Sequence, residues 1–272
     1  MKKKQLARIA KGYCLELMLS SEKLLPGFSI GAVHRYRVQY KKLRAFLRML
    51  RTGSTASGYL RLPKQLKTVY GLAGSIRDLQ LHKQQVQYIF HNKQKKPESY
   101  LLKVKQEIAN SKKALRDYFS ETNLKGGTEK IIQALPESFS KKALYHYTNK
   151  QWEQVAQLVA TKHITDANMH LIRKILKDLY YNMTILDEAR FVVKAGKQQR
   201  FVSLQLFSAL MGQLGKFQDL TTEIRMLGPS QLKGLPAEAQ GELQLLRATF
   251  IMQKNKQKRE LARQFEKLLG AT

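Results

Sequence analysis

The chain has 272 residues with a hydrophobic fraction of 43%, enough to bury a substantial core in one large domain or two modest ones. Its 49 Lys and Arg residues against 20 Asp and Glu give a formal net charge of +29, which implies a polyanionic partner or an acidic surface. The single cysteine, Cys14, excludes an intrachain disulfide and a C-x-x-C metal site, and no apolar run approaches the roughly 20 residues that span a bilayer.

The first predicted helix covers residues 3–20. The chain opens with basic residues, as a signal peptide does, but Arg8, Lys11 and Glu16 interrupt the segment that would have to be uncharged. We therefore expect a helix of the mature protein. A lone cysteine fits a reducing compartment, and the expected location is the cytoplasm.

The second predicted helix, residues 30–51, carries a stripe of cationic side chains. With 3.6 residues per turn, the six side chains fall within a sector of about 100°. They are His34, Arg37, Lys41, Arg44, Arg48 and Arg51. Like charges one turn apart destabilise a helix, so the stripe is predicted to hold anions.

An apolar stripe lies beside the cationic one on the same predicted helix. It consists of Val33, Tyr36, Tyr40, Leu43, Leu47 and Leu50. Proteins that bind single-stranded nucleic acid interleave aromatic side chains with cations as stacking platforms. Because these tyrosines and Phe46 lie off the cationic sector, core packing is the favoured interpretation for them.

The next elements are predicted from composition and from breakers of secondary structure. Residues 52–58 form a Gly/Ser-rich loop, and helices follow at 59–72, 77–90 and 97–119. Residues 123–128 are the best boundary in the chain, and Pro136 breaks any helix between 129 and 147. The final helix is predicted at 237–269.

Two motifs of the first half recur in the second. Residues 170–179 align with 34–43 at an offset of 136, and residues 215–220 align with 74–79 at an offset of 141. Two matched motifs in the same order indicate an internal duplication. We predict repeats at 1–122 and 150–272, joined by a linker around 123–149.

The second copy has lost several cations. Asp178 and Tyr180 stand where the first copy has Lys42 and Arg44, and Gln218 stands where it has Arg77. Thr184 and Asp187 likewise replace two arginines of the stripe. The second copy is therefore predicted to hold anions less strongly.

Residues 34–44 read H-x-x-R-V-x-x-K-K-L-R, and residues 71–79 supply a Gly-rich segment that runs into R-D. Both resemble the signature of the CHAD family, the conserved-histidine α-helical domain, and the resemblance covers nearly all of residues 1–272. It implies a single all-α domain of two duplicated four-helix-type bundles that flank a central basic channel. The channel would bind inorganic polyphosphate without catalysis and without a cofactor. Association with polyphosphate granules in the cytoplasm is an open extension of this prediction.

The predicted anion-binding residues come from the two stripes and their surroundings. His34 and His170 head the stripes, while Arg116, Arg190, Lys197 and Arg200 are included only for their basic character and context. The full set is His34, Arg37, Lys41, Lys42, Arg44, Arg48, Arg77, His170, Arg173, Lys174, Lys177, Lys216, Arg116, Arg190, Lys197 and Arg200. Arg and Lys suit phosphate because guanidinium forks pair bidentately with its oxygens and ammonium groups supply movable charge.

Several alternatives stay open at this point. The two stripe histidines could contact phosphate or serve structural roles, and no histidine spacing favours a metal. Asp78 and Asp219, the matched acids, are favoured as partners of stripe cations or helix caps over Mg²⁺ ligands or a general base. A nucleic-acid-binding protein and a polyphosphate-processing enzyme remain the rival functions, although no nucleophile with a partnered base is visible.

Overall fold

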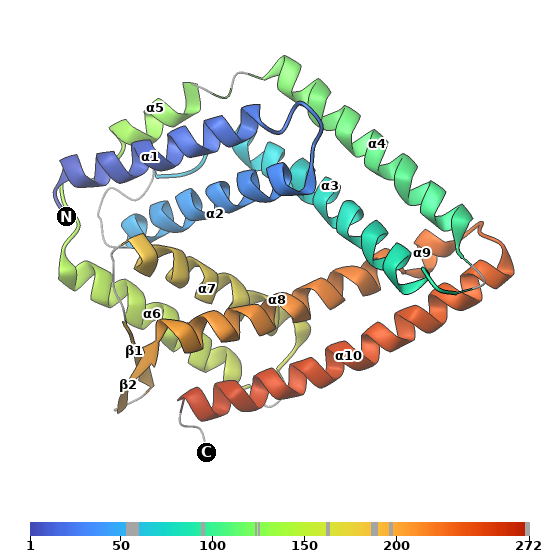
Figure 1. Cartoon of the computed structure of the whole chain (residues 1–272). Coiled ribbons are helices and arrows are strands. Elements are labelled where there is room, and N and C mark those ends of the chain that lie inside the picture. Colours follow the sequence, from blue (N-terminus) through green and yellow to red (C-terminus); the bar gives the residue numbers. More distant parts are fainter. Residues whose placement is uncertain are drawn as a thin grey trace.

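The computed structural model describes residues 1–52, 60–93, 96–122, 124, 126–161, 164–185, 190–195 and 198–269. These ranges are almost entirely helical (Figure 1), which confirms the all-α prediction. The helices are α1 (Lys3–Glu22), α2 (Ile30–Thr52), α3 (Lys64–Ile89), α4 (Glu98–Glu121), α5 (Gly126–Gln133), α6 (Lys141–Val159), α7 (Asp166–Ile185), α8 (Leu204–Met226), α9 (Pro229–Leu232) and α10 (Ala237–Leu269). A two-stranded antiparallel hairpin, β1 (Arg190–Ala195) and β2 (Gln198–Ser203), falls between α7 and α8 and is absent from the sequence prediction.

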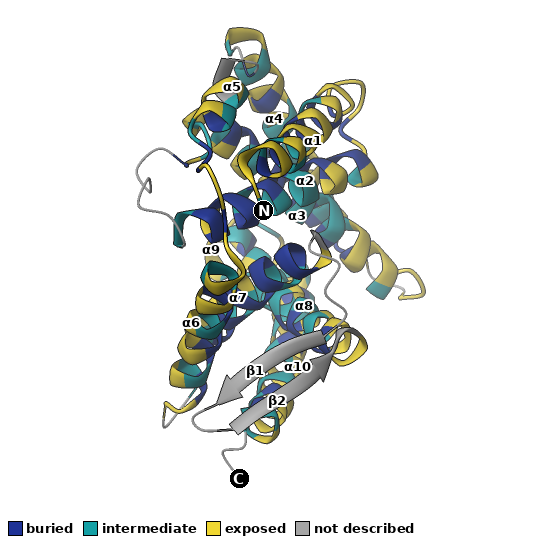
Figure 2. Ribbon diagram, turned by 90° about the vertical axis from the view of Figure 1, so that its left-hand side faces the viewer, coloured by how far each residue is buried: buried dark blue, intermediate teal, exposed yellow. Residues whose placement is uncertain are grey.

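Four helices, α2, α3, α7 and α8, form the inner part of the fold (Figure 1). In the first half of the chain α1 packs on α2 and α4 on α3, and in the second half α6 packs on α7 and α10 on α8. The halves meet where α2 contacts α7 and α3 contacts α8. Figure 2 shows that α7 is mostly buried, whereas α1 and α6 present exposed residues outward.

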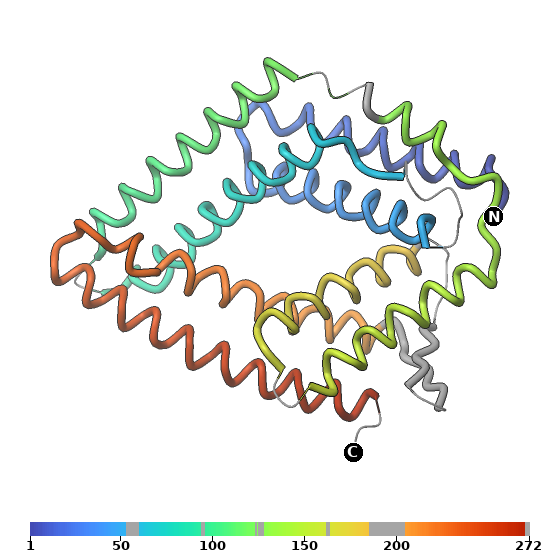
Figure 3. The backbone as a smooth tube through the Cα atoms, turned by 180° about the vertical axis from the view of Figure 1, so that it is seen from behind, coloured from blue at the N-terminus to red at the C-terminus, as the bar shows by residue number. Residues whose placement is uncertain are grey.

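The order of neighbours is the same in both halves, and Figure 3 shows α1–α4 on one side and α6–α10 on the other. One contact joins two residues that the predicted duplication would make counterparts. The Nδ1 atom of His82 lies 2.5 Å from Oε2 of Glu223, and these residues are 141 positions apart, which is the offset of the second motif. A residue that touches its own counterpart lies next to the axis that relates two copies.

Helices are expected at 59–72 and 77–90, and α3 covers most of both ranges, but the predicted turn between them is wrong. α3 is one continuous helix that includes Gly71 and Gly74. Glycine costs a helix only about 1 kcal/mol relative to alanine, and the burial of residues on either side, such as Ala73, outweighs this cost. The predicted loop at 52–58 lies outside the described residues, apart from residue 52, which closes α2.

The other boundaries agree closely with the sequence. Helices predicted at 3–20, 30–51 and 97–119 correspond to α1, α2 and α4, and the last helix is found at Ala237–Leu269 as predicted. The predicted linker around 123–149 contains α5 and the first half of α6. The division into two repeats stays a prediction.

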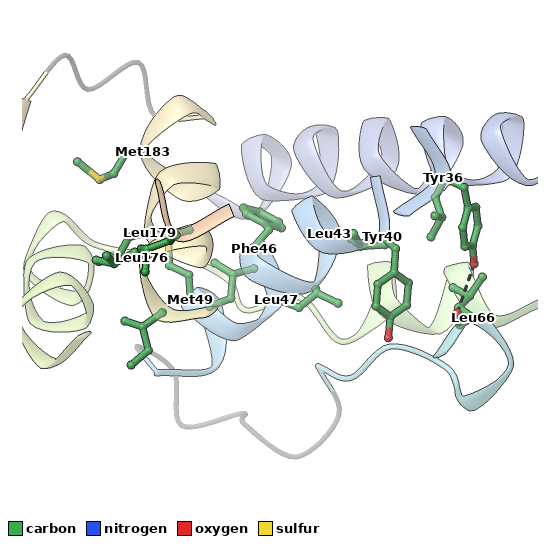
Figure 4. Close-up of a cluster of buried hydrophobic side chains, with 14 of the residues drawn as sticks. Tyr36, Tyr40, Leu43, Phe46, Leu47, Met49, Leu66, Leu176, Leu179 and Met183 are labelled. Carbon is green, nitrogen blue, oxygen red and sulfur yellow. Dashed lines mark hydrogen bonds between the residues drawn. The ribbon is translucent and has the colours of Figure 1, made fainter. Parts of the chain in front are cut away.

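The main core lies between α1, α2 and α7. All six apolar stripe residues of α2 are at most 3% exposed, as is Phe46, so the core role predicted for them is confirmed. Figure 4 shows α2 side chains together with Leu176 and Leu179 of α7 in the same cluster. A dashed line in the same view marks the hydrogen bond that the Tyr36 hydroxyl donates to the Leu66 carbonyl oxygen, 3.3 Å away. The apolar stripe thereby fixes which way the cationic stripe faces.

Candidate functional site

Cationic side chains of α2, α3 and α7 gather where the two halves of the chain meet. Each is close enough to several of the others to influence their charge. We call them the central basic cluster, which consists of His34, Arg37, Lys41, Arg77, Arg173 and Lys177. All six belong to the residues predicted from the sequence to bind anions.

Burial and mutual repulsion make the cluster a poor place for positive charge. Burial, and next the nearby Lys177, lower the pKa of Lys41 from 10.5 to about 7. Burial and the nearby Arg173 likewise lower the pKa of Lys177 to about 8. The pKa of His34 is also lowered, first by desolvation and then by Arg77. An anion in the cluster would offset these effects and favour the protonated forms.

Arg37 is held against α3 by contacts that the sequence analysis missed. Its Nη1 atom donates a hydrogen bond to the Tyr70 carbonyl oxygen at 2.9 Å, and its guanidinium carbon lies 4.4 Å from the centre of the Tyr70 ring. A Cβ atom at Gly74 would lie only 2.1 Å from Nη1 of Arg37. The glycine therefore creates the space that the guanidinium occupies.

The arginines of the cluster retain hydrogen-bonding capacity. The buried Nε atoms of Arg37, Arg77 and Arg173 have no hydrogen-bond partner among the described residues. Buried polar groups are usually paired, so three such donors in one cluster point to an external acceptor. The carboxylate of Asp219 acts on this cluster. It raises the pKa of Arg173, whereas burial lowers the pKa of the same side chain.

The C-terminal part of the α2 stripe is arranged differently. Arg48 donates a hydrogen bond from Nη1 to Oδ2 of Asp178 at 2.6 Å, and Nη2 of Arg44 lies 3.9 Å from Oδ1 of the same carboxylate. Asp178 is only 4% exposed. The acid that replaces a cation in the second copy therefore neutralises cations of the first copy and binds α7 to α2.

The remaining predicted residues do not join the cluster. Lys42 lines a groove beside α1 together with Arg8 and Gln39, because it faces a different side of α2. The Nδ1 atom of His170 lies 2.5 Å from Oε1 of Gln218, so this histidine has a partner within its own half.

Lys174 is exposed, and Lys216 lines a pocket that also includes Arg77. Arg116 lies on α4 with its guanidinium carbon 5.2 Å from the centre of the Phe28 ring. The side chains of Arg190 and Arg200 and the whole of Lys197 lie outside the described residues.

Tyr70 is a residue of the site that the sequence analysis missed. Its ring stacks on Tyr40 with centroids 4.3 Å apart and faces Arg37 and Arg44. A guanidinium over an aromatic ring is stabilised by cation–π attraction. No periodic pattern marks Tyr70, since it belongs to a different helix from the stripe.

Two further observations concern metal binding and membrane insertion. Within the described ranges, no group of three or more His, Cys, Asp and Glu side chains is arranged to hold a metal ion. None of the helices described is long and apolar enough to cross a membrane.

The fold and the cluster together define a helical protein whose interior cations converge between two similarly arranged halves. The chain belongs to the CHAD domain family, whose sequence model matches residues 12–228. Its fold is similar to the crystal structure of the CHAD domain from the plant Ricinus communis, with a TM-score of 0.74 at 13% identity, over 100% of this chain and 92% of that one. No curated protein matches the sequence.

Proposed function

We propose that this protein binds inorganic polyphosphate in the central basic cluster and does not convert it. The observation that carries the proposal is the convergence of six cationic or titratable side chains from α2, α3 and α7, with two lysines whose pKa values burial lowers. A linear chain of phosphates supplies closely spaced anionic oxygens along its whole length. It can therefore neutralise cations from several helices and accept hydrogen bonds from the orphaned Nε atoms.

Binding without catalysis is supported by the position of the nearby acids. Oδ2 of Asp78 lies 3.4 Å from Nη2 of Arg225, and Asp219 faces Arg173 and Arg77. Each carboxylate is thus placed against cations of the protein. Asp219 would thereby orient two arginines of the central basic cluster, which is the role the sequence analysis favoured for it, whereas the partner of Asp78 lies outside the cluster.

The first test is a competition assay at physiological salt. Labelled long-chain polyphosphate is bound to the protein, RNA or duplex DNA is added in excess, and the polyphosphate is recovered with and without Mg²⁺. We expect polyphosphate to stay bound and to be returned unshortened. Displacement by nucleic acid would make the cluster a general polyanion site, whose affinity falls steeply with salt, and shortened chains would make the protein an enzyme.

A second readout is thermal stability. Mutual repulsion should make the empty protein less stable at low salt than at moderate salt, and polyphosphate should relieve it. A ligand at 100 times its dissociation constant adds roughly 2.7 kcal/mol to the free energy of unfolding. A melting temperature that is indifferent to polyphosphate would contradict the proposal.

A further inference from the structure

A second set of cations surrounds the C-terminal end of α2, beyond the central basic cluster. Two pockets of about 290 and 420 Å³ lie there and share Arg51 and Arg61 in their linings. We call them together the α2-end groove. Its cationic or titratable residues are Arg44, Arg48, Arg51, Arg61, Lys67, His146 and Lys150.

Among the described residues, no acidic side chain lines either pocket. Arg51, Arg61 and Lys150 form no ion pair with any carboxylate of the described residues. Asp178 is the acid that approaches from α7, and it is engaged by Arg48 and Arg44. The outer part of the groove therefore concentrates positive charge that no carboxylate in the described part of the chain neutralises, and such a concentration is costly unless an anion binds.

The groove continues directly from the central basic cluster. Tyr70 contacts Arg37 on the cluster side and lines the groove together with Arg44. From Lys41 to Arg51 the α2 stripe advances about 15 Å at 1.5 Å per residue. A single extended anion can thus follow α2 from the cluster into the groove.

Helix α6 of the second half is fixed at the end of this path. The Nδ2 atom of Asn182 donates to the Ala45 carbonyl oxygen at 3.1 Å and lies 3.3 Å from the Tyr147 hydroxyl. Asn182 is only 1% exposed, so these contacts hold α6 and α7 against the middle of α2. They place His146 and Lys150, on the same helix as Tyr147, where they line the groove.

The opposite end of the cluster has a different character. A pocket of about 780 Å³ between α3, α8 and α10 includes Arg77 of the cluster and Asp219 in its lining. Its charged lining is mixed, with Asp78, Glu223 and Glu260 beside Lys216 and Lys256. Carboxylates repel a polyanion, so the two exits from the cluster are not equivalent.

We propose that the α2-end groove is a second segment of the anion site, which takes the part of a long polyphosphate chain that extends beyond the central basic cluster. The proposal rests on the proposed function. It assigns chain-length preference to residues outside the family signature, namely Arg61, Lys67 and Lys150. Short chains would be held by the cluster alone.

The test compares a groove variant with a control variant that loses the same charge elsewhere. The groove variant is Arg61→Gln/Lys67→Gln/Lys150→Gln, and the control is Lys11→Gln/Lys105→Gln/Lys130→Gln, at exposed positions on α1, α4 and α5. Affinities are measured for tripolyphosphate and for long-chain polyphosphate, and helicity is checked by circular dichroism. All six side chains are exposed, so both variants should fold.

We expect the groove variant to lose at least about tenfold in affinity for the long chain, with little change for tripolyphosphate and little change for either ligand in the control. An equal loss for both ligands, or the same loss in the control, would show a general charge effect and overturn the inference. Unchanged long-chain binding would overturn it as well. If the unmodified protein bound neither ligand, the proposed function itself would fail.

Discussion

The α2–α3 pair and the α7–α8 pair carry matched sequence motifs, but the structure uses the matched positions differently. In the first pair, His34 and Lys41 face the other cations of the central basic cluster, and no carboxylate of the described residues pairs with them. In the second pair, the counterpart of Lys42 is Asp178, which holds Arg48, and the counterpart of Arg77 is Gln218, which holds His170.

The positions of α7 and α8 that lack these cations contact the protein itself, across the halves through Asp178 and within the half through Gln218. Two cations of the cluster, Arg173 and Lys177, come from α7. The first half therefore supplies most of the cations of the cluster, and Asp178 of the second half holds α7 against α2.

The largest effect is expected from charge reversal at the two half-buried lysines of the central basic cluster. Lys41→Glu with Lys177→Glu should weaken polyphosphate binding by about 100-fold or more, since charged hydrogen bonds contribute about 1.5–3 kcal/mol each. The same change removes repulsion in the empty protein, so its melting temperature should rise. Calorimetric titration and thermal melts measure the two effects. A parallel fall of affinity and melting temperature would mean that these lysines are structural.

The second test removes the carboxylate of Asp178, which neutralises Arg48 and holds α7 against α2. Asp178→Asn should destabilise the protein by about 1–3 kcal/mol, because a buried charged partner is lost. It should also increase affinity for polyphosphate severalfold, because Arg44 and Arg48 become available to the ligand. Denaturant unfolding and binding are measured on the same preparation. Lower affinity in a folded variant would contradict this role.

The pH dependence of stability and of polyphosphate binding tests the role of Lys41. Its pKa is 10.5 as a free side chain and about 7 in the folded protein, so the unfolded chain binds more protons between these values. The free energy of unfolding of the empty protein should therefore rise as the pH increases from 7 to 9. Polyphosphate affinity should fall severalfold over the same range, because the ligand needs the charged lysine. Lys41→Arg, which stays charged, should flatten both trends; unaltered trends in this variant would point to other groups.

The smallest expected effect is a difference in stability between alanine variants of two glycines at matched positions. Gly215→Ala meets open space and should stabilise α8 by up to about 1 kcal/mol through helix propensity. Gly74→Ala gains the same propensity but displaces the Arg37 guanidinium from the Tyr70 carbonyl oxygen, which costs about 1 kcal/mol. Chemical denaturation should rank Gly215→Ala as the more stable variant. Equal stabilisation would show that Arg37 relocates without cost.

The sequence by itself determined the all-α class and the two faces of α2. Periodicity is a local property, so the burial of Tyr36 and Leu43 follows from spacing alone. The same spacing marked His34, Arg37 and Lys41 of the central basic cluster, and the matched motifs marked Arg77, Arg173 and Lys177. Motif membership and basic character also marked Lys42 and Arg116, which the structure places elsewhere, because neither says which way a side chain faces.

Only the tertiary structure decided how these charges are used. Arg37 contacts Tyr70 across 33 positions of sequence, and Arg48 contacts Asp178 across 130. Gly74 looks like a turn residue in the sequence, yet it lies inside a helix and makes room for a guanidinium. Helix periodicity arises from neighbours in the chain, whereas charge neutralisation depends on which distant side chains the packing of helices brings together.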